Sequence, residues 1–152
     1  MSVPDGKTEE ADVGVGLRIE GPVRTMTVER LMLYGVSLAS AVAGRPTPAP
    51  RNIHTDEAYA QQQGWPNVIA DGMITANWIH SMLADRFGRS FLETGELSTK
   101  FIRPVTAGDV VRVGAEVVGV EEENGRKRLQ LSVWCTDGGE RPFTVGDASV
   151  TI

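Results

Sequence analysis

Cysteine and histidine are scarce in this chain, and their scarcity excludes several kinds of site. The 152 residues contain one cysteine, Cys135, and two histidines. A single cysteine cannot form a disulfide within the chain, and so few Cys and His residues cannot form a zinc site of the usual kind. The sequence also lacks a glycine-rich phosphate loop and a serine nucleophile elbow. We therefore expect no metal ion and no cofactor.

Basic residues and long apolar runs are also few. Lys and Arg number 15 against 20 Asp and Glu, the net charge is -5, and no basic block is present that would neutralise a phosphate backbone. No stretch approaches the ~18 apolar residues of a membrane-spanning helix, and the first 16 residues lack the basic end and apolar run of a secretory signal. We expect no nucleic-acid partner, no membrane segment and a cytoplasmic location.

What the chain does contain is the composition of one soluble globular domain. Hydrophobic residues make up 41% and charged residues 23%. Residues 1–15 mix proline, glycine and charges without periodicity, which predicts a flexible N-terminal tail. Residues 16–152 then form a single domain without internal repeats.

Apolar residues recur at helical spacing in the first half of the domain. Thr27 can cap a helix that continues to Gly44. Three prolines, at positions 46, 48 and 50, hold the next segment extended, and this stiff loop leads directly to His54. Thr55 or Asp56 then caps a short helical turn over residues 57–60.

The third predicted helix is the most apolar segment of the chain. Asp71 is its N-cap and Gly88 its end. Apolar side chains on nearly every side of it predict a helix that is buried nearly all round. We therefore expect His80, within this helix, to be a core histidine with a hydrogen-bonded ring.

The second half of the domain changes from helical to alternating periodicity. Strands are predicted at residues 97–102, 111–117, 129–135 and 143–152. Four or five antiparallel strands with one hydrophobic helix against them are the simplest arrangement that buries these patterns, so the fold class is α+β. Cys135 alternates in phase with buried positions, and we interpret it as a small apolar core residue and not as a nucleophile.

Four residues are candidates for chemistry, and each also has a structural interpretation. His54 follows a stiff loop and is either catalytic or a structural histidine. Gly72 begins the apolar helix, where its N–H can stabilise an oxyanion or its lack of a side chain can allow close packing. Asp56 and Asp71 are acids near His54, and both also fit the role of helix cap.

The order and spacing of several motifs resemble the MaoC-like dehydratase family of hot-dog proteins. The motifs are Asn-Ile-His-Thr-Asp-Glu-Ala-Tyr-Ala at 52–60, Gly-Trp-Pro at 64–66, Val-Ile-Ala-Asp-Gly-Met at 68–73, Leu-Ser-Thr-Lys-Phe-Ile-Arg-Pro at 97–104 with Gly108-Asp109, and Val-Gly-Asp-Ala at 145–148. The resemblance implies a long hydrophobic central helix wrapped by an antiparallel sheet. It also implies a homodimer or larger even assembly that binds an acyl thioester of coenzyme A or acyl carrier protein.

The resemblance also identifies a variant catalytic motif. Family members commonly use an Asp five residues before the His, and that position is Ala49 here. The family Asn between them is matched by Arg51, and the usual His before the helix glycine is matched by Asp71. His54 and Gly72 are retained.

From the retained residues we expect His54 to act as the base, with Asp56 or Asp71 supplying or orienting the missing acid. The Gly72 N–H is expected to stabilise the enolate-like oxygen. The other expected substrate contacts are Arg51, Asn52 and Met73.

The resulting hypothesis is a hydratase or dehydratase that adds water to an enoyl thioester or removes it from a 3-hydroxyacyl thioester, in a specialised pathway. Two alternatives remain open. One is a non-catalytic or partner subunit that completes a heteromeric dehydratase, which the loss of Asp at Ala49 favours. The other is a hot-dog thioesterase, or an enzyme of elimination, isomerisation or cyclisation.

Overall fold

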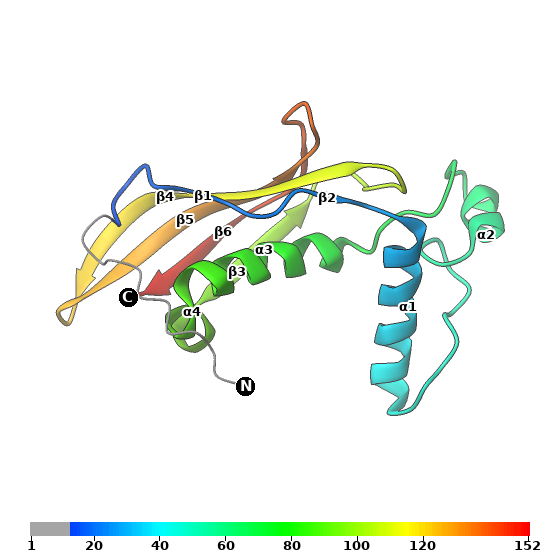
Figure 1. Ribbon diagram of the computed structural model, residues 1–152, viewed down its shortest axis with the longest axis horizontal. Helices are drawn as coiled ribbons and strands as arrows, with labels where there is room; N and C mark the ends of the chain where they lie inside the picture. Colours follow the sequence, from blue (N-terminus) through cyan, green and yellow to red (C-terminus); the bar gives the residue numbers. More distant parts are fainter. Residues whose placement is uncertain (1–12) are drawn as a thin grey trace.

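The computed structural model describes residues 13–152, and it contains six strands and four helices (Figure 1). The expected tail at 1–15 lies mostly outside the described residues; of its last three residues, Val13 is buried. In chain order the elements are β1 Arg18–Glu20, β2 Arg24–Thr25, α1 Val28–Ala43, α2 Glu57–Gln62, α3 Gly72–Phe87, α4 Arg89–Thr94, β3 Glu96–Phe101, β4 Val110–Glu123, β5 Arg126–Thr136 and β6 Pro142–Thr151.

All strand pairings are antiparallel, and the strands lie in the order β1-β4-β5-β6-β3. The two-residue β2 pairs with β4 farther along the edge that β1 occupies, at Arg24 opposite Val111. Among the described strands β3 pairs only with β6, so it forms the opposite edge of the sheet. The predicted antiparallel sheet is confirmed, with six strands in place of four or five.

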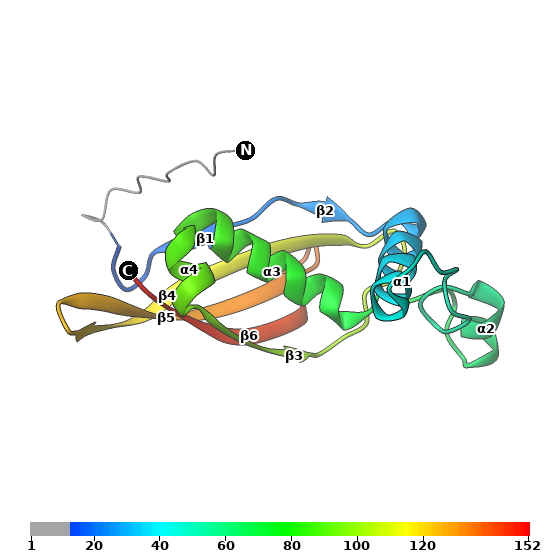
Figure 2. The same ribbon diagram turned by 90° about the horizontal axis from the view of Figure 1, so that it is seen from below.

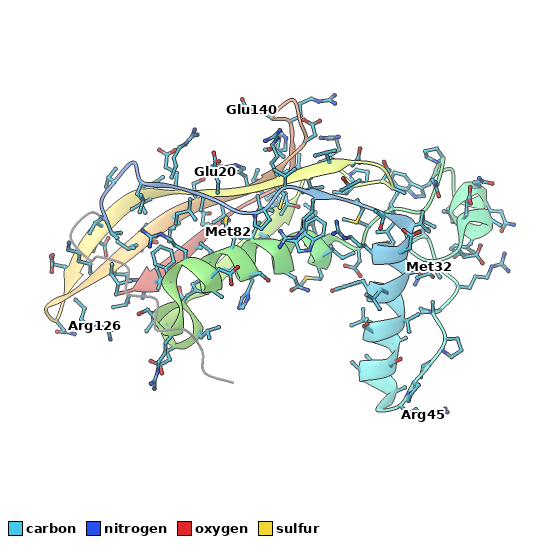
Figure 3. All side chains as sticks on the ribbon, in the orientation of Figure 1. Glu20, Met32, Arg45, Met82, Arg126 and Glu140 are labelled. Atoms are coloured by element: carbon cyan, nitrogen blue, oxygen red, sulfur yellow. The ribbon has the colours of Figure 1, made fainter. Side chains whose placement is uncertain are left out.

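The core lies between one face of this sheet and α3, which runs along it (Figures 1 and 2). Alternate residues of the strands face the helix, as their period of two requires. Met82 of α3 lies between the helix and the sheet in Figure 3. The core residues from β4, β5 and β6 include Val113, Ala115, Leu131, Val133, Cys135, Phe143 and Val150.

The expectation that α3 is buried nearly all round is wrong. The sheet covers one side of the helix, including Ile79 and Leu83, while Met73 is 48% exposed on the other side. His80 is exposed too, so the expected core histidine with a hydrogen-bonded ring is also wrong; its ring packs edge-on against Phe91. The many apolar residues of α3 hid the fact that Asn77, His80 and Ser81 lie on one side of the helix, which the sheet leaves exposed.

α1 and α2 lie beyond one end of the sheet, and α1 points away from it (Figures 1 and 2). The predicted limits of α1 are confirmed: the Thr27 side chain accepts from the Arg30 N–H, and Gly44 ends the helix at a left-handed φ of 66°. Arg45 therefore lies at the far tip of α1 (Figure 3). Within the described residues, no helix is long and apolar enough to cross a membrane.

Candidate active site

His54 lies in a compact turn at the end of the proline-containing loop that follows α1. The Asn52 side chain accepts the His54 N–H at 2.8 Å, and the Asn52 carbonyl accepts the N–H groups of Thr55 and Asp56. This is an Asx turn, in which the asparagine side-chain oxygen accepts a hydrogen bond in the way that a backbone carbonyl does in an ordinary turn. The segment is joined to the body of the protein by the Ile69 N–H, which donates to the Ile53 carbonyl at 3.1 Å.

The imidazole of His54 is fixed by a main-chain carbonyl. Nδ1 lies 2.9 Å from the carbonyl oxygen of Ile69, which can only accept a hydrogen bond. Neutral His54 therefore has its proton on Nδ1 and a free lone pair on Nε2. This tautomer is the one that a general base at Nε2 requires.

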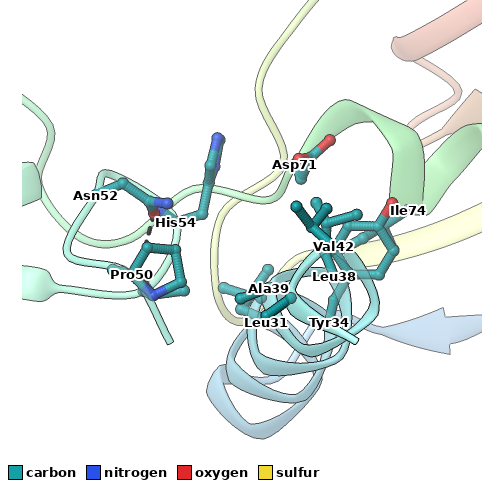
Figure 4. Close-up of a pocket in the computed structure, with 13 residues that line it drawn as sticks. Leu31, Tyr34, Leu38, Ala39, Val42, Pro50, Asn52, His54, Asp71 and Ile74 are labelled. Atoms are coloured by element: carbon teal, nitrogen blue, oxygen red, sulfur yellow. Dashed lines mark hydrogen bonds between the residues drawn. The ribbon is translucent and has the colours of Figure 1, made fainter. Parts of the chain in front are cut away.

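His54 lines a cavity of about 350 Å³ between α1, the loop that contains His54 and the start of α3 (Figure 4). We name it the histidine cavity. Most of its wall is apolar and comes from α1 and the adjoining loops. The apolar side chains include Leu31, Leu38, Ala39, Val42, Pro50 and Ile74.

The polar groups of the histidine cavity are few. Besides His54 they belong to Tyr34, Asn52, Thr55 and Asp71. Asp71 caps α3, because its carboxylate accepts the Met73 N–H at 2.9 Å. Burial, and then the nearby Asp71 carboxylate, raise the pKa of Tyr34 above its ordinary value near 10, against a weaker opposing hydrogen bond with the Asn77 side chain. Tyr34 is thus a protonated hydroxyl at neutral pH.

Gly72 lies next to the histidine cavity, in a hollow of about 260 Å³ that shares Asp71 with it. A Cβ at Gly72 would lie 2.8 Å from the ring of Phe101, so this glycine does allow close packing. Its N–H, in the first turn of α3, has no acceptor among the described residues. The Thr75 hydroxyl donates to the Gly72 carbonyl. The Thr75 hydroxyl also forms a hydrogen bond with the hydroxyl of Thr144 in β6, which joins the first turn of α3 to the sheet.

Three of the expected site residues lie outside both spaces. Asp56 caps α2 by accepting the Tyr59 N–H, and it forms an ion pair with Arg51 at 3.0 Å. Arg51 also lies over the Tyr59 ring, toward α2 and not among the cavity residues. Met73 is half exposed and lines neither space. Asn52 lines the histidine cavity, although its side-chain oxygen is used by the turn.

Tyr34 was not among the site residues expected from the sequence. Its place on the apolar face of α1, four residues before Leu38, is the signal that could have found it. The neighbouring Gly35 is a second signal, because a Cβ there would lie 2.5 Å from the Thr55 methyl group. Only a glycine lets α1 approach the loop of His54 so closely.

The Cys135 thiol is not reactive, and the acidic residues do not form a metal site among the described residues. Burial raises the pKa of the Cys135 thiol to about 12, which keeps it protonated and unreactive. In the part of the chain that the structure describes, no group of three or more His, Cys, Asp and Glu residues could hold a metal ion.

Known proteins are similar to this chain in sequence and in fold. The family model of the MaoC like domain matches residues 50–137, more than half of the chain. An (R)-specific enoyl-CoA hydratase from Rhodospirillum rubrum is 31% identical over 99 residues, which cover 65% of this chain and 67% of the relative. The chain belongs to the MaoC-like family. Its α+β fold is accordingly the hot-dog fold, with a central helix against an antiparallel sheet.

Solved structures extend the likeness of this MaoC-like protein to nearly its whole length. The unliganded R-hydratase PhaJ1 from Pseudomonas aeruginosa has a TM-score of 0.70 and 25% identity, with 92% of this chain and 82% of that chain covered. A C-terminally truncated HadBC (3R-hydroxyacyl-ACP dehydratase) complex from Mycobacterium tuberculosis shares the fold, with a TM-score of 0.65, 14% identity and coverage of 91% and 96%.

Proposed function

We propose that this MaoC-like protein is a hydro-lyase that adds water to enoyl thioesters of coenzyme A or acyl carrier protein, and removes it from 3-hydroxyacyl thioesters. The observation that supports this most strongly is the hydrogen bond from His54 Nδ1 to the Ile69 carbonyl. It leaves Nε2 as a base beside an apolar cavity, which is what activation of water next to an acyl chain requires.

The two adjoining spaces fit the two parts of such a substrate. The acyl chain lies along the apolar wall that α1 gives the histidine cavity. The thioester carbonyl lies at the start of α3, where the two spaces share Asp71. There the Gly72 N–H and the helix dipole stabilise the negative charge that develops on the oxygen as water attacks the β-carbon.

Of the two carboxylates expected near His54, Asp71 fits the proposed site better. It lines both spaces, whereas Asp56 is paired with Arg51 and turned toward α2. We assign Asp71 the role of orienting polar groups at the start of α3. Arg51 and Met73 remain proposed contacts for parts of the substrate beyond these two spaces.

A second candidate function has a specific observation in its favour. Ala49 replaces the acid that the family motif has five residues before the histidine, and its methyl group cannot transfer a proton. A partner subunit with a complete acid and base pair would supply the chemistry in that case. The protein alone would then bind thioesters without turning them over.

We propose in addition that two copies associate along β3. This strand is paired on one side only, and Phe101 and Ile102 at its end are each about half exposed. Pairing of two β3 strands would satisfy the open edge and cover these side chains. We propose the cytoplasm as the site of action, which the free thiol of Cys135 supports.

The test is a turnover screen of the purified protein alone. Enoyl thioesters of increasing chain length, on coenzyme A and on acyl carrier protein, are followed by loss of the enoyl absorbance, with released thiol measured in parallel. Hydration that disappears in His54→Ala is the expected result. Thiol release without hydration would indicate a thioesterase, and no turnover until a partner is added would indicate the heteromeric subunit.

A further inference from the structure

The proposed hydration needs two proton transfers, and His54 accounts for only one of them. Nε2 accepts a proton from water, and in the family motif an Asp acts together with the histidine on the substrate proton. The family's acid has no equivalent here, since its position is Ala49. A proton donor for the α-carbon must therefore come from elsewhere in the wall of the histidine cavity.

The cavity offers few protons that are not already donated. The Thr55 hydroxyl donates to the Pro50 carbonyl, with the Asn52 side chain also within reach, and His54 Nδ1 donates to Ile69. Asp71 accepts the Met73 N–H. Among the described side chains that line the cavity, Tyr34 alone has a hydroxyl proton with no acceptor among the described residues. Its hydrogen bond with Asn77 lowers the Tyr34 pKa, so in that contact the amide donates to the hydroxyl oxygen.

The position of Tyr34 matches that need. Tyr34 belongs to α1 and lines the cavity together with Asp71 and Ile74 at the start of α3. In Figure 4 its ring lies on the side of the cavity away from His54. The nearby Asp71 carboxylate disfavours loss of the phenolic proton before substrate binds, because it would place two negative charges together. The proton is therefore retained until the enolate forms.

We infer that Tyr34 is the catalytic residue that protonates the α-carbon, an inference that rests on the proposed function. As His54 removes a proton from water, the oxygen bonds to the β-carbon and the double-bond electrons move onto the thioester carbonyl. The enolate then re-forms the carbonyl and takes the Tyr34 proton at the α-carbon. Solvent water returns the proton from the His54 imidazolium to the Tyr34 phenolate, and the net reaction is the addition of one water molecule.

The central experiment compares Tyr34→Phe with Tyr59→Phe. Tyr59 is the only other tyrosine in the chain, and it lies on α2 outside the cavity lining. We expect Tyr34→Phe to lower kcat for hydration ~10²-fold with little change in KM. The solvent deuterium isotope effect on kcat should rise, because protonation of the α-carbon becomes rate-limiting. Tyr59→Phe should match the wild type.

A second variant distinguishes the contribution of Tyr34 to kcat from that of the neighbouring Asp71. Asp71→Asn replaces the carboxylate with a neutral amide that cannot accept a proton and pass it on, while the asparagine still caps α3. We expect its kcat to fall less than that of Tyr34→Phe. An equal or larger fall would assign the proton to Asp71 and overturn the inference.

The inference and the proposed function can fail separately. A wild-type protein without hydratase activity overturns both. An active wild type that needs His54 but loses less than about twofold of kcat in Tyr34→Phe overturns only the role of Tyr34. Lost activity with a raised KM and an unchanged isotope effect would show that Tyr34 acts only through packing, and it would overturn the inference as well.

Discussion

The imidazole of His54 and the main-chain carbonyl of Ile69 lie 2.9 Å apart, nitrogen to oxygen, and their hydrogen bond determines what the histidine can do. Many catalytic histidines are held by a carboxylate, which both orients the ring and stabilises its positive charge. A neutral carbonyl orients the ring and selects the tautomer without adding a charge. In the proposed hydration, His54 is therefore a base whose imidazolium passes its proton on to solvent.

The first prediction concerns the chemistry of His54. We expect His54→Ala to lower kcat for hydration at least ~10²-fold, because the base is removed. His54→Asn is the matched control, since an amide nitrogen can take the place of Nδ1 and donate to Ile69 but offers no base. It should be as inactive as His54→Ala and up to ~1 kcal/mol more stable in urea unfolding. Near-normal turnover in either variant would show that His54 is not the base, and the carboxylates of Asp56 and Asp71 would become the candidates.

The second prediction concerns the N–H of Gly72. A Cβ at this position would lie 2.8 Å from the Phe101 ring, so valine would displace that ring and fill the space above the N–H. We expect Gly72→Val to lower kcat/KM at least ~10²-fold through the loss of oxyanion stabilisation. Phe101→Leu relieves the clash, and we expect that adding it to Gly72→Val does not restore activity. If the double variant regained activity, Gly72 would serve packing only.

A helix or strand could be predicted from the sequence where the residues that define it lie close together in the chain. The limits of α1 and α3 were predictable because Thr27, Gly44 and Asp71 act within one helical turn of their own positions. β1, β2 and α4 were missed, since they have three, two and six residues and depend on contacts with distant segments. Such short elements have no periodicity of their own.

The candidate site likewise contains residues that the sequence predicted and one residue, Tyr34, that it did not. The sequence singled out His54, Asp71 and Gly72, and the structure places His54 and Asp71 in one cavity with Gly72 in the adjoining hollow. Tyr34 could not be predicted, because its role depends on how α1 packs on the loop of His54 through Gly35. The same limit applied to His80, whose exposure depends on which side of α3 the sheet covers.

The third prediction is a loss of stability at alkaline pH from Cys135. Burial raises the pKa of the thiol to about 12 in the folded protein, while its ordinary value is 9.0. The unfolded chain therefore loses this proton first, and the free energy of unfolding falls as pH rises from about 9 toward 12. Between pH 8 and pH 10 the loss should be about 1 kcal/mol. Cys135→Ala should lack this component in urea titrations, and an identical pH dependence in the two proteins would contradict it.

The last prediction concerns assembly. Apolar side chains are exposed on α1 and at the end of β3, including Leu33 at 68%, Phe101 at 50% and Ile102 at 51%. Because β3 is also an unpaired edge, we expect light scattering at micromolar concentration to give at least twice the 16.4 kDa of one chain. Ile102→Glu should reduce the assembly, since it places a charge where the second copy would pack. Val118→Glu, at a side chain 54% exposed on β4, is the matched control and should not. A wild-type mass equal to one chain would show that β3 is not an interface, and the proposed active site would then have to be complete within a single chain.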